Sequence, residues 1–178
     1  MSDGLDNKQP CLFENTDLFL NDNDASGYAV MYCDGACSGN PGKSGAGVVI
    51  TLTDKNYTPL NEEQKYTISE YIGVATNNIA EYSALIKGLE KARTLSIENI
   101  KIFLDSELIV RQVNGVYKVK NRNLLPLFQK VKDLLKNFEA FTLTHVRREF
   151  NKDADALARL GVEKSNINCM GKVRLKSR

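Results

Sequence analysis

The chain has 178 residues, of which 42% are hydrophobic and 26% charged, and its formal net charge is +2. This composition suits one globular domain with a sizeable core. No apolar run reaches the ~18 residues that a membrane span needs, and the N-terminal sequence MSDGLDNKQP lacks the basic and apolar stretches of a secretory signal. We therefore expect a cytoplasmic protein that does not bind membranes.

The charge is unevenly distributed along the chain. Residues 1–28 contain six acidic residues and one basic residue, whereas residues 159–178 contain six basic residues and one acidic residue. A basic body with a basic tail suits a polyanionic partner, although a run of charge is usually only a solvated surface. We predict a flexible acidic extension over residues 1–27, a domain over residues 28–163 and a basic tail over residues 164–178.

The cysteines do not suggest a metal site. Cys11, Cys33, Cys37 and Cys169 are scattered, and His145 is the sole histidine. This spacing argues against zinc, so we expect buried or free thiols in a reducing compartment.

The first half of the domain predicts a three-stranded antiparallel meander. Runs of apolar residues, partly alternating with polar ones, indicate strands over residues 28–36, 45–53 and 64–73. The small residues Gly39, Pro41, Gly42 and Gly45 mark the turn between the first two strands.

The second half alternates helices with strands. Apolar residues at three- and four-residue steps predict helices over residues 77–95, 106–115, 122–138 and 151–162, and short strands cover residues 100–105 and 140–148. Alternation of this kind favours parallel strands. We therefore predict an α/β fold with a mixed five-stranded sheet, three antiparallel strands followed by two parallel ones, and helices on both faces.

Four acidic residues stand out in these elements. Asp34 lies inside an apolar strand, where a buried carboxylate costs several kcal/mol unless a partner or a cation offsets its charge. Glu81 lies one turn into the first helix, Asp105 ends the fourth strand and Asp155 opens the last helix. Each of the latter three could instead cap a helix or favour its first turn.

The predicted topology brings these acids together. If the first and fourth strands pair in parallel, Asp34 lies near Asp105, and helices packed on the sheet can bring Glu81 and Asp155 to the same edge. Four converging carboxylates repel one another unless cations lie between them. Oxygen ligands select a hard cation such as Mg²⁺ or Mn²⁺, and a pair of such ions suits displacement at phosphorus.

Four motifs in this order resemble type 1 ribonuclease H: YCDGACSGNPGKSGAGVVI, TNNIAEYSALIKGLE, IFLDSELIV and NKDADALA. The resemblance extends from about Tyr28 to Gly161. It implies the ribonuclease H-like fold and a monomeric endoribonuclease that hydrolyses the RNA strand of RNA–DNA hybrids, leaving 3′-hydroxyl and 5′-phosphate ends. It also implies that two Mg²⁺ ions, for which Mn²⁺ is an alternative, are held by Asp34, Gly35, Glu81, Asp105 and Asp155.

The resemblance also suggests where the hybrid binds. Asn40, Asn77 and Asn78 match positions that meet its minor groove, where amides can bond to base edges and 2′-hydroxyls. Thr76 and Cys37 match positions near the DNA strand, and the backbone near Gly35 and Cys37 would contact 2′-hydroxyls. The same amides could serve only as turn and cap residues.

Two departures from the family pattern concern loops. The basic handle of many members is absent after Asn114-Gly115, where Lys118, Lys120 and Arg122 form a smaller basic patch. The family's histidine before the last acid is also absent, because the loop here reads VRREFN. Arg148 is the candidate for that catalytic role, and His145 is predicted to lie on the preceding strand.

A third departure is Glu107, which stands where better-known members carry glutamine. Its carboxylate would repel phosphate, so we expect no substrate contact from it.

Two other functions remain open at this stage. The first is a hybrid- or RNA-binding module that has lost catalysis, since a fold alone does not guarantee a function. The second is an integrase or resolvase with the same fold. The complete acid set argues against the first, and the TNN loop with the order Asp, Glu, Asp, Asp favours ribonuclease H over the second.

Overall fold

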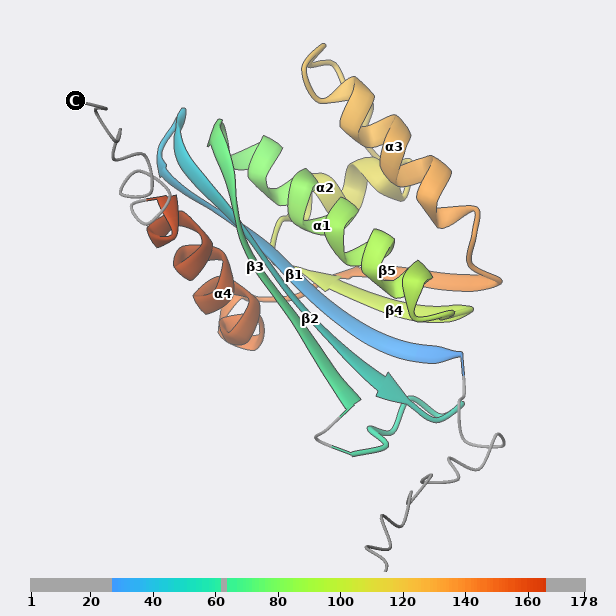
Figure 1. Ribbon diagram of the computed structural model, residues 1–178. Coiled ribbons are helices and arrows are strands. Elements are labelled where there is room, and N and C mark those ends of the chain that lie inside the picture. The colour runs from blue at the N-terminus through green and yellow to red at the C-terminus, as the bar shows by residue number, and fades with distance from the viewer. Residues whose placement is uncertain (1–26, 62–63, 166–178) are drawn as a thin grey trace, which may run out of the picture.

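The structure is a computed structural model that describes residues 27–61 and 64–165 (Figure 1). The elements are β1 (Tyr28–Gly39), β2 (Gly42–Thr53), β3 (Lys65–Ala75), α1 (Asn77–Thr94), β4 (Asn99–Leu104), α2 (Glu107–Val113), α3 (Leu125–Leu135), β5 (Ala140–His145), the 3-10 turn η2 (Arg148–Phe150) and α4 (Lys152–Glu163). All of the predicted acidic extension except Gly27, most of the basic tail, Cys11 and Cys169 lie outside the described residues.

The five strands form one sheet in the order β3-β2-β1-β4-β5. β2 pairs antiparallel with both β1 and β3, whereas β4 pairs in parallel with both β1 and β5. The predicted α/β fold and its mixed sheet are therefore confirmed. Because β1 and β4 run side by side in the same direction, both point their carboxyl ends toward the same edge of the sheet.

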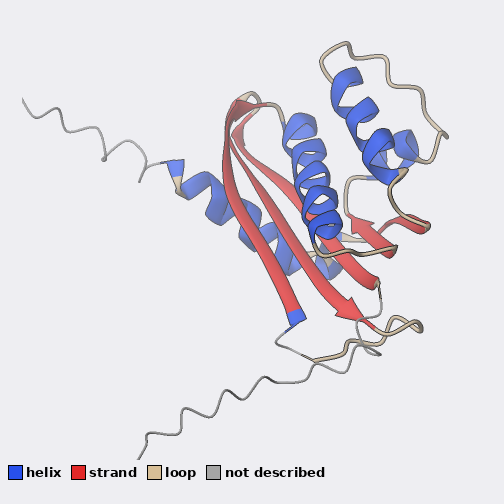
Figure 2. Cartoon of the chain, turned by 45° about the vertical axis from the view of Figure 1, so that its right-hand side comes forward, coloured by secondary structure: helices blue, strands red, loops and turns tan. Residues whose placement is uncertain are grey.

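Helices cover both faces of this sheet, as predicted. α1 packs on β1 and β2 on one face, with α3 beside it, and α4 packs on β2, β1 and β3 on the other (Figures 1 and 2). The side of α1 that faces the sheet is apolar and buried at Leu85, Leu89 and Ala92, which is the periodicity that predicted the helix. The site described below lies where the amino ends of α1 and α4 approach the end of β4.

The hairpin between β1 and β2 is longer than predicted. The two strands pair as far as Gly39 and Gly42, which leaves only Asn40 and Pro41 at its tip. Gly45 is therefore not part of the turn. It lies inside β2, where a Cβ atom would stand 2.2 Å from the backbone oxygen of Ala158 in α4. A side chain at this position would push α4 off the sheet.

No helix within residues 27–61 and 64–165 is both long enough and apolar enough to cross a membrane.

Candidate active site

Three carboxylates converge just beyond the carboxyl end of β4, beside the middle of β1. Asp34, Glu81 and Asp105 each place one oxygen within 4.8 Å of the other two. Asp34 and Glu81 are almost fully buried, with 4% and 6% of their surface exposed. The register pairs Tyr32 of β1 with Phe103 of β4. Asp34 and Asp105 each follow two residues later, so they lie side by side.

Glu81 reaches this cluster because Gly35 lets α1 approach β1 closely. A Cβ atom on Gly35 would lie 2.2 Å from the backbone carbon of Ala80 and from the backbone nitrogen of Glu81. The Gly35 N–H donates to Glu81 Oε2 at 3.2 Å. The residue that caps α1 is Thr76, so the alternative in which Glu81 serves only as a helix cap is wrong.

Asp105 follows β4 directly, since that strand ends at Leu104 rather than at Asp105. Ser106 is the residue that caps α2, so the cap alternative is wrong for Asp105 as well. Its Oδ1 accepts a hydrogen bond from the side-chain amide of Asn151 at 3.0 Å. Asp105 is therefore held by a contact across the site rather than by the helix that follows it.

Asp155 lies in the first turn of α4, as predicted, and outside the group of three. Arg148 Nη2 donates to its Oδ1, and Arg159 Nη2 lies 2.9 Å from its Oδ2. Sequence reasoning missed Arg159. The available signal was its spacing, since a residue four positions after Asp155 in a helix lies on the same side of it.

The pKa values of these acids shift in opposite directions, because burial and mutual repulsion raise those of Asp34 and Glu81 whereas neighbouring arginines lower that of Asp155. Burial, with the charges of Asp105 and Asp155, raises the pKa of Asp34 to about 7. Burial, with the charges of Asp34 and Asp105, also raises the pKa of Glu81. Burial acts against ionisation of Asp155 too, but the hydrogen bond and charge of Arg148 outweigh it and lower the pKa.

The acids line a cleft of about 360 Å³. Its other walls come from β1, α1, η2 and α4. The lining residues are Asp34, Gly35, Ala36, Cys37, Asn77, Glu81, Asp105, Arg148, Asp155 and Arg159. Three of the predicted substrate residues, Gly35, Cys37 and Asn77, are therefore in this wall. Asn40, Thr76 and Asn78 are not.

Hydrogen bonds tie the β1–β2 turn to the start of α1. Asn40 Oδ1 accepts from the backbone N–H of Asn77 at 3.2 Å. The thiol of Cys37 donates to the carbonyl of Ala75 at 3.1 Å, and the Ser44 hydroxyl donates to that sulfur at 3.2 Å. Asn40 therefore also has a structural role, because its side chain joins the turn between β1 and β2 to the start of α1.

Thr76 and Asn78 complete this region at the start of α1. Thr76 caps the helix through its backbone, and its side chain makes no capping hydrogen bond. Both residues are partly exposed, and Asn77 between them is exposed.

The remaining sequence candidates lie around this region. The Glu107 carboxylate forms an ion pair with Arg111 at 2.7 Å, which occupies it on the surface of α2. His145 lies on β5, as predicted, and is exposed, but the strand ends at His145 rather than at residue 148. Three basic residues in the loop between α2 and α3 are also exposed, namely Lys118, Lys120 and Arg122.

The donor set of the cleft fits a hard divalent cation. The three converging groups are carboxylates and offer only oxygen atoms, which Mg²⁺ and Mn²⁺ prefer over nitrogen or sulfur. Asp34 and Glu81 resist ionisation in this environment, as their raised pKa values indicate, and a cation between them would remove the repulsion that contributes to this.

Comparisons with known proteins agree with this geometry. Residues 32–161 match the family described as reverse transcriptase-like. "Bifunctional protein Rv2228c" of Mycobacterium tuberculosis is 39% identical over 129 residues, which cover 72% of this chain and 34% of that protein. "Ribonuclease HI" of Halobacterium salinarum is 36% identical over 135 residues, which cover 76% of this chain and 64% of that protein. The chain thus spans about a third and about two thirds of these two relatives.

A solved structure shows the same arrangement of elements. LC11-RNase H1 in complex with an RNA/DNA hybrid is 37% identical and superposes with a TM-score of 0.66, over 77% of this chain and 98% of that one. The resemblance to type 1 ribonuclease H is therefore confirmed by a family match over most of the chain, by similar sequences and by a similar fold. The chain belongs to the type 1 ribonuclease H family.

Proposed function

We propose that the protein is an endoribonuclease that hydrolyses the RNA strand of RNA–DNA hybrids and leaves 3′-hydroxyl and 5′-phosphate ends. The observation that carries the proposal is the meeting of Asp34, Glu81 and Asp105 within 4.8 Å, beside Asp155, in an open cleft. The relative named ribonuclease HI and the hybrid-bound LC11-RNase H1 support the same activity and substrate.

The four acids and the backbone of Gly35 would hold two Mg²⁺ ions, for which Mn²⁺ is the alternative. When bound, such ions lower the pKa of a water molecule and stabilise the leaving oxygen. The chain's part is to fix the spacing of the carboxylates. The Gly35 N–H orients Glu81, and the two arginines beside Asp155 place positive charge where a phosphate would enter.

Selection of the hybrid would come from the start of α1 and the β1–β2 turn. Asn77 is exposed in the wall of the cleft, and Asn40 contacts it through a hydrogen bond. Amide groups can donate to and accept from 2′-hydroxyls and base edges. We assign contacts with the minor groove to Asn40, Asn77 and Asn78. The backbone near Gly35 and Cys37 would contact 2′-hydroxyls, and Cys37 and Thr76 would lie near the DNA strand.

Arg148 is proposed to assist turnover, and its removal gives a first prediction. Arg148→Ala should lower kcat on hybrid roughly 100-fold, because a cation beside the reacting phosphate stabilises developing charge. Asp153→Asn is the control, since Asp153 is exposed in the first turn of α4, the turn that also carries Asp155, and forms an ion pair with Lys65 at 3.3 Å, away from the cleft. A control variant as slow as Arg148→Ala would contradict this role, and steady-state kinetics measure both.

A cleavage assay tests the proposed function directly. End-labelled RNA–DNA hybrid, double-stranded RNA and DNA duplex are each incubated with Mg²⁺, Mn²⁺ or a chelator. We expect cleavage of RNA in the hybrid only, dependent on the metal and absent in an Asp105→Asn variant. Binding of hybrid without cleavage would favour the non-catalytic module, and cleavage or strand transfer of DNA would favour an integrase or resolvase.

We further propose that the domain over residues 28–163 acts as a monomer in the cytoplasm. The family match over residues 32–161 supports these limits for the domain.

A further inference from the structure

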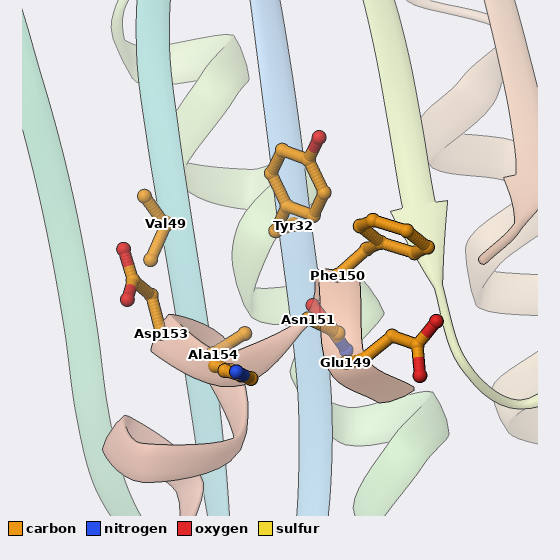
Figure 3. Close-up of a pocket in the computed structure, with 8 residues that line it drawn as sticks. Tyr32, Val49, Glu149, Phe150, Asn151, Asp153 and Ala154 are labelled. Carbon is orange, nitrogen blue, oxygen red and sulfur yellow. The ribbon is translucent and has the colours of Figure 1, made fainter. Parts of the chain in front are cut away.

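Asn151 is a buried amide that lies between β1, β4 and α4. Only 1% of its surface is exposed. Its side-chain nitrogen donates to the carbonyl oxygen of Cys33 and to Oδ1 of Asp105, both at 3.0 Å. Figure 3 shows Asn151 over β1, where η2 passes into α4, beneath Tyr32 and Phe150. One NH₂ group therefore joins the carboxylate of Asp105 to the residue before Asp34.

The backbone of Asn151 contacts the other side of the site. Its carbonyl oxygen accepts from the N–H of Asp155 at 3.0 Å, and its N–H donates to the carbonyl of Arg148 at 3.0 Å. Asn151 also caps α4. A single residue is thus bonded to Asp105, to the strand that carries Asp34, and to the segments that carry Asp155 and Arg148.

The chemistry of these contacts calls for an uncharged double donor. Both partners of the side-chain nitrogen are oxygen atoms that can only accept, so the amide cannot be turned around without placing its oxygen against them. The side-chain oxygen is buried with no hydrogen-bond partner in the described part of the chain. Leaving a buried oxygen unpaired is unfavourable, so what the position requires is the pair of donated bonds.

We propose that Asn151 is a positioning residue that holds Asp105 and Asp155 at fixed distances from Asp34. Through these distances it sets the affinity of the cleft for divalent cations. This inference rests on the proposed function. Groups that hydrogen-bond to metal ligands fix the direction of those ligands, and their removal typically weakens metal binding or activity by 10–100-fold. Asn151 holds one proposed ligand by its side chain and another by its backbone.

The chain offers a matched control in Asn114. Its side-chain nitrogen donates to the carbonyl of Leu143 at 3.0 Å and so ties the end of α2 to β5. Asn114→Ala removes the same chemical group and the same kind of bond, and neither residue of that pair lines the cleft. A role limited to stability predicts that Asn114→Ala and Asn151→Ala differ only in how far they lower Tm.

The experiment measures Mg²⁺ binding and catalysis separately in full-length wild type, Asn151→Ala, Asn151→Ser and Asn114→Ala. Calorimetric titration with Mg²⁺ should show affinity about 10–100-fold weaker in Asn151→Ala. The kcat of Asn151→Ala on hybrid at a fixed Mg²⁺ concentration should fall along with this affinity, and its KM for hybrid should change little. A higher Mg²⁺ concentration should restore part of the lost kcat. Asn114→Ala should bind Mg²⁺ like the wild type.

Asn151→Ser keeps the test decisive if Asn151→Ala does not fold. The serine hydroxyl has a single hydrogen and can donate to only one of the two acceptors, so Asn151→Ser should lose less Mg²⁺ affinity than Asn151→Ala. Wild-type Mg²⁺ affinity in a folded Asn151 variant would overturn the inference. A wild type that binds Mg²⁺ but does not cleave hybrid would overturn the proposed function alone, because the binding measurement does not depend on hydrolysis.

Discussion

Replacement of Asp34 by asparagine is expected to lower hydrolysis of hybrid by several orders of magnitude while the fold is kept. Asp34 is one of the three acids whose oxygens lie within 4.8 Å of one another. Asparagine has nearly the same shape but no negative charge, so the cleft would lose its hold on a divalent cation. Near-normal turnover by a folded Asp34→Asn protein would contradict the metal-dependent mechanism.

The same substitution is expected to stabilise the protein in the presence of a chelator at alkaline pH. The pKa of the Asp34 carboxyl is about 7 in this fold, against an ordinary value of 3.8 for the unfolded chain. Between these values the folded state binds more protons than the unfolded state, so the free energy of unfolding decreases as pH rises. Wild type should therefore lose on the order of a few kcal/mol of stability across this window.

The side chain at position 34 does not titrate in the Asp34→Asn variant, so this pH-dependent loss of stability should occur in wild type only. Urea unfolding in chelator should show Asp34→Asn more stable than wild type at pH 8, with a smaller difference at pH 4 to 5. Added Mg²⁺ should stabilise wild type more than the variant, because only wild type keeps the full set of ligands. A difference between the two proteins that does not change with pH would show that folding does not disfavour the Asp34 charge.

Gly35→Ala is expected to have the second-largest effect, on both stability and activity. The added methyl group would stand 2.2 Å from backbone atoms of Ala80 and Glu81, and backbone in the first turns of a helix cannot move aside as a flexible side chain can. Overpacking of this kind costs about 1–3 kcal/mol or more. It would also push Glu81 away from Asp34, so the stabilisation by Mg²⁺ should be lost.

Gly27→Ala is the control for this prediction. It adds the same methyl group immediately before β1, where the nearest atoms all belong to Glu98 and lie at 3.2 Å. Gly27→Ala should lose much less stability than Gly35→Ala in urea unfolding, because its contacts at 3.2 Å require a shift of only a few tenths of an ångström, and its cleavage rate should stay close to that of the wild type. If Gly35→Ala unfolds at the wild-type urea concentration and still responds to Mg²⁺, then α1 does not approach β1 as closely as described.

Much of the fold could be predicted from the sequence because each element carries its own pattern. Apolar residues at three- and four-residue steps predicted α1 to within one residue, and the short apolar run before Asp105 predicted β4. The order of strands and helices then limited the sheet to few arrangements, since strands joined by helices pair in parallel. The candidate acids were found in the same way, because a carboxylate inside an apolar strand has no local explanation.

Other features depend on contacts between residues far apart in the chain, and a local pattern does not contain them. Gly45 was read as a turn residue, because a glycine near other glycines usually is one, but its position against α4 exists only when the sheet and helix are packed. Asn151 was missed for the same reason. It breaks no sequence pattern, and its side-chain partners, Cys33 and Asp105, lie 118 and 46 residues away in the sequence.

The amino-acid pattern alone thus specified which residues form strands and helices and which acids could bind a cation, because apolar periodicity and charge are properties of the residues. The packed fold was needed to show which of those acids meet, which one is instead paired with two arginines, and which neutral side chain holds them. Hydrogen bonds and repulsion act over a few ångströms in space, and only the packed sheet and helices bring Asp34, Glu81 and Asp105 within that range.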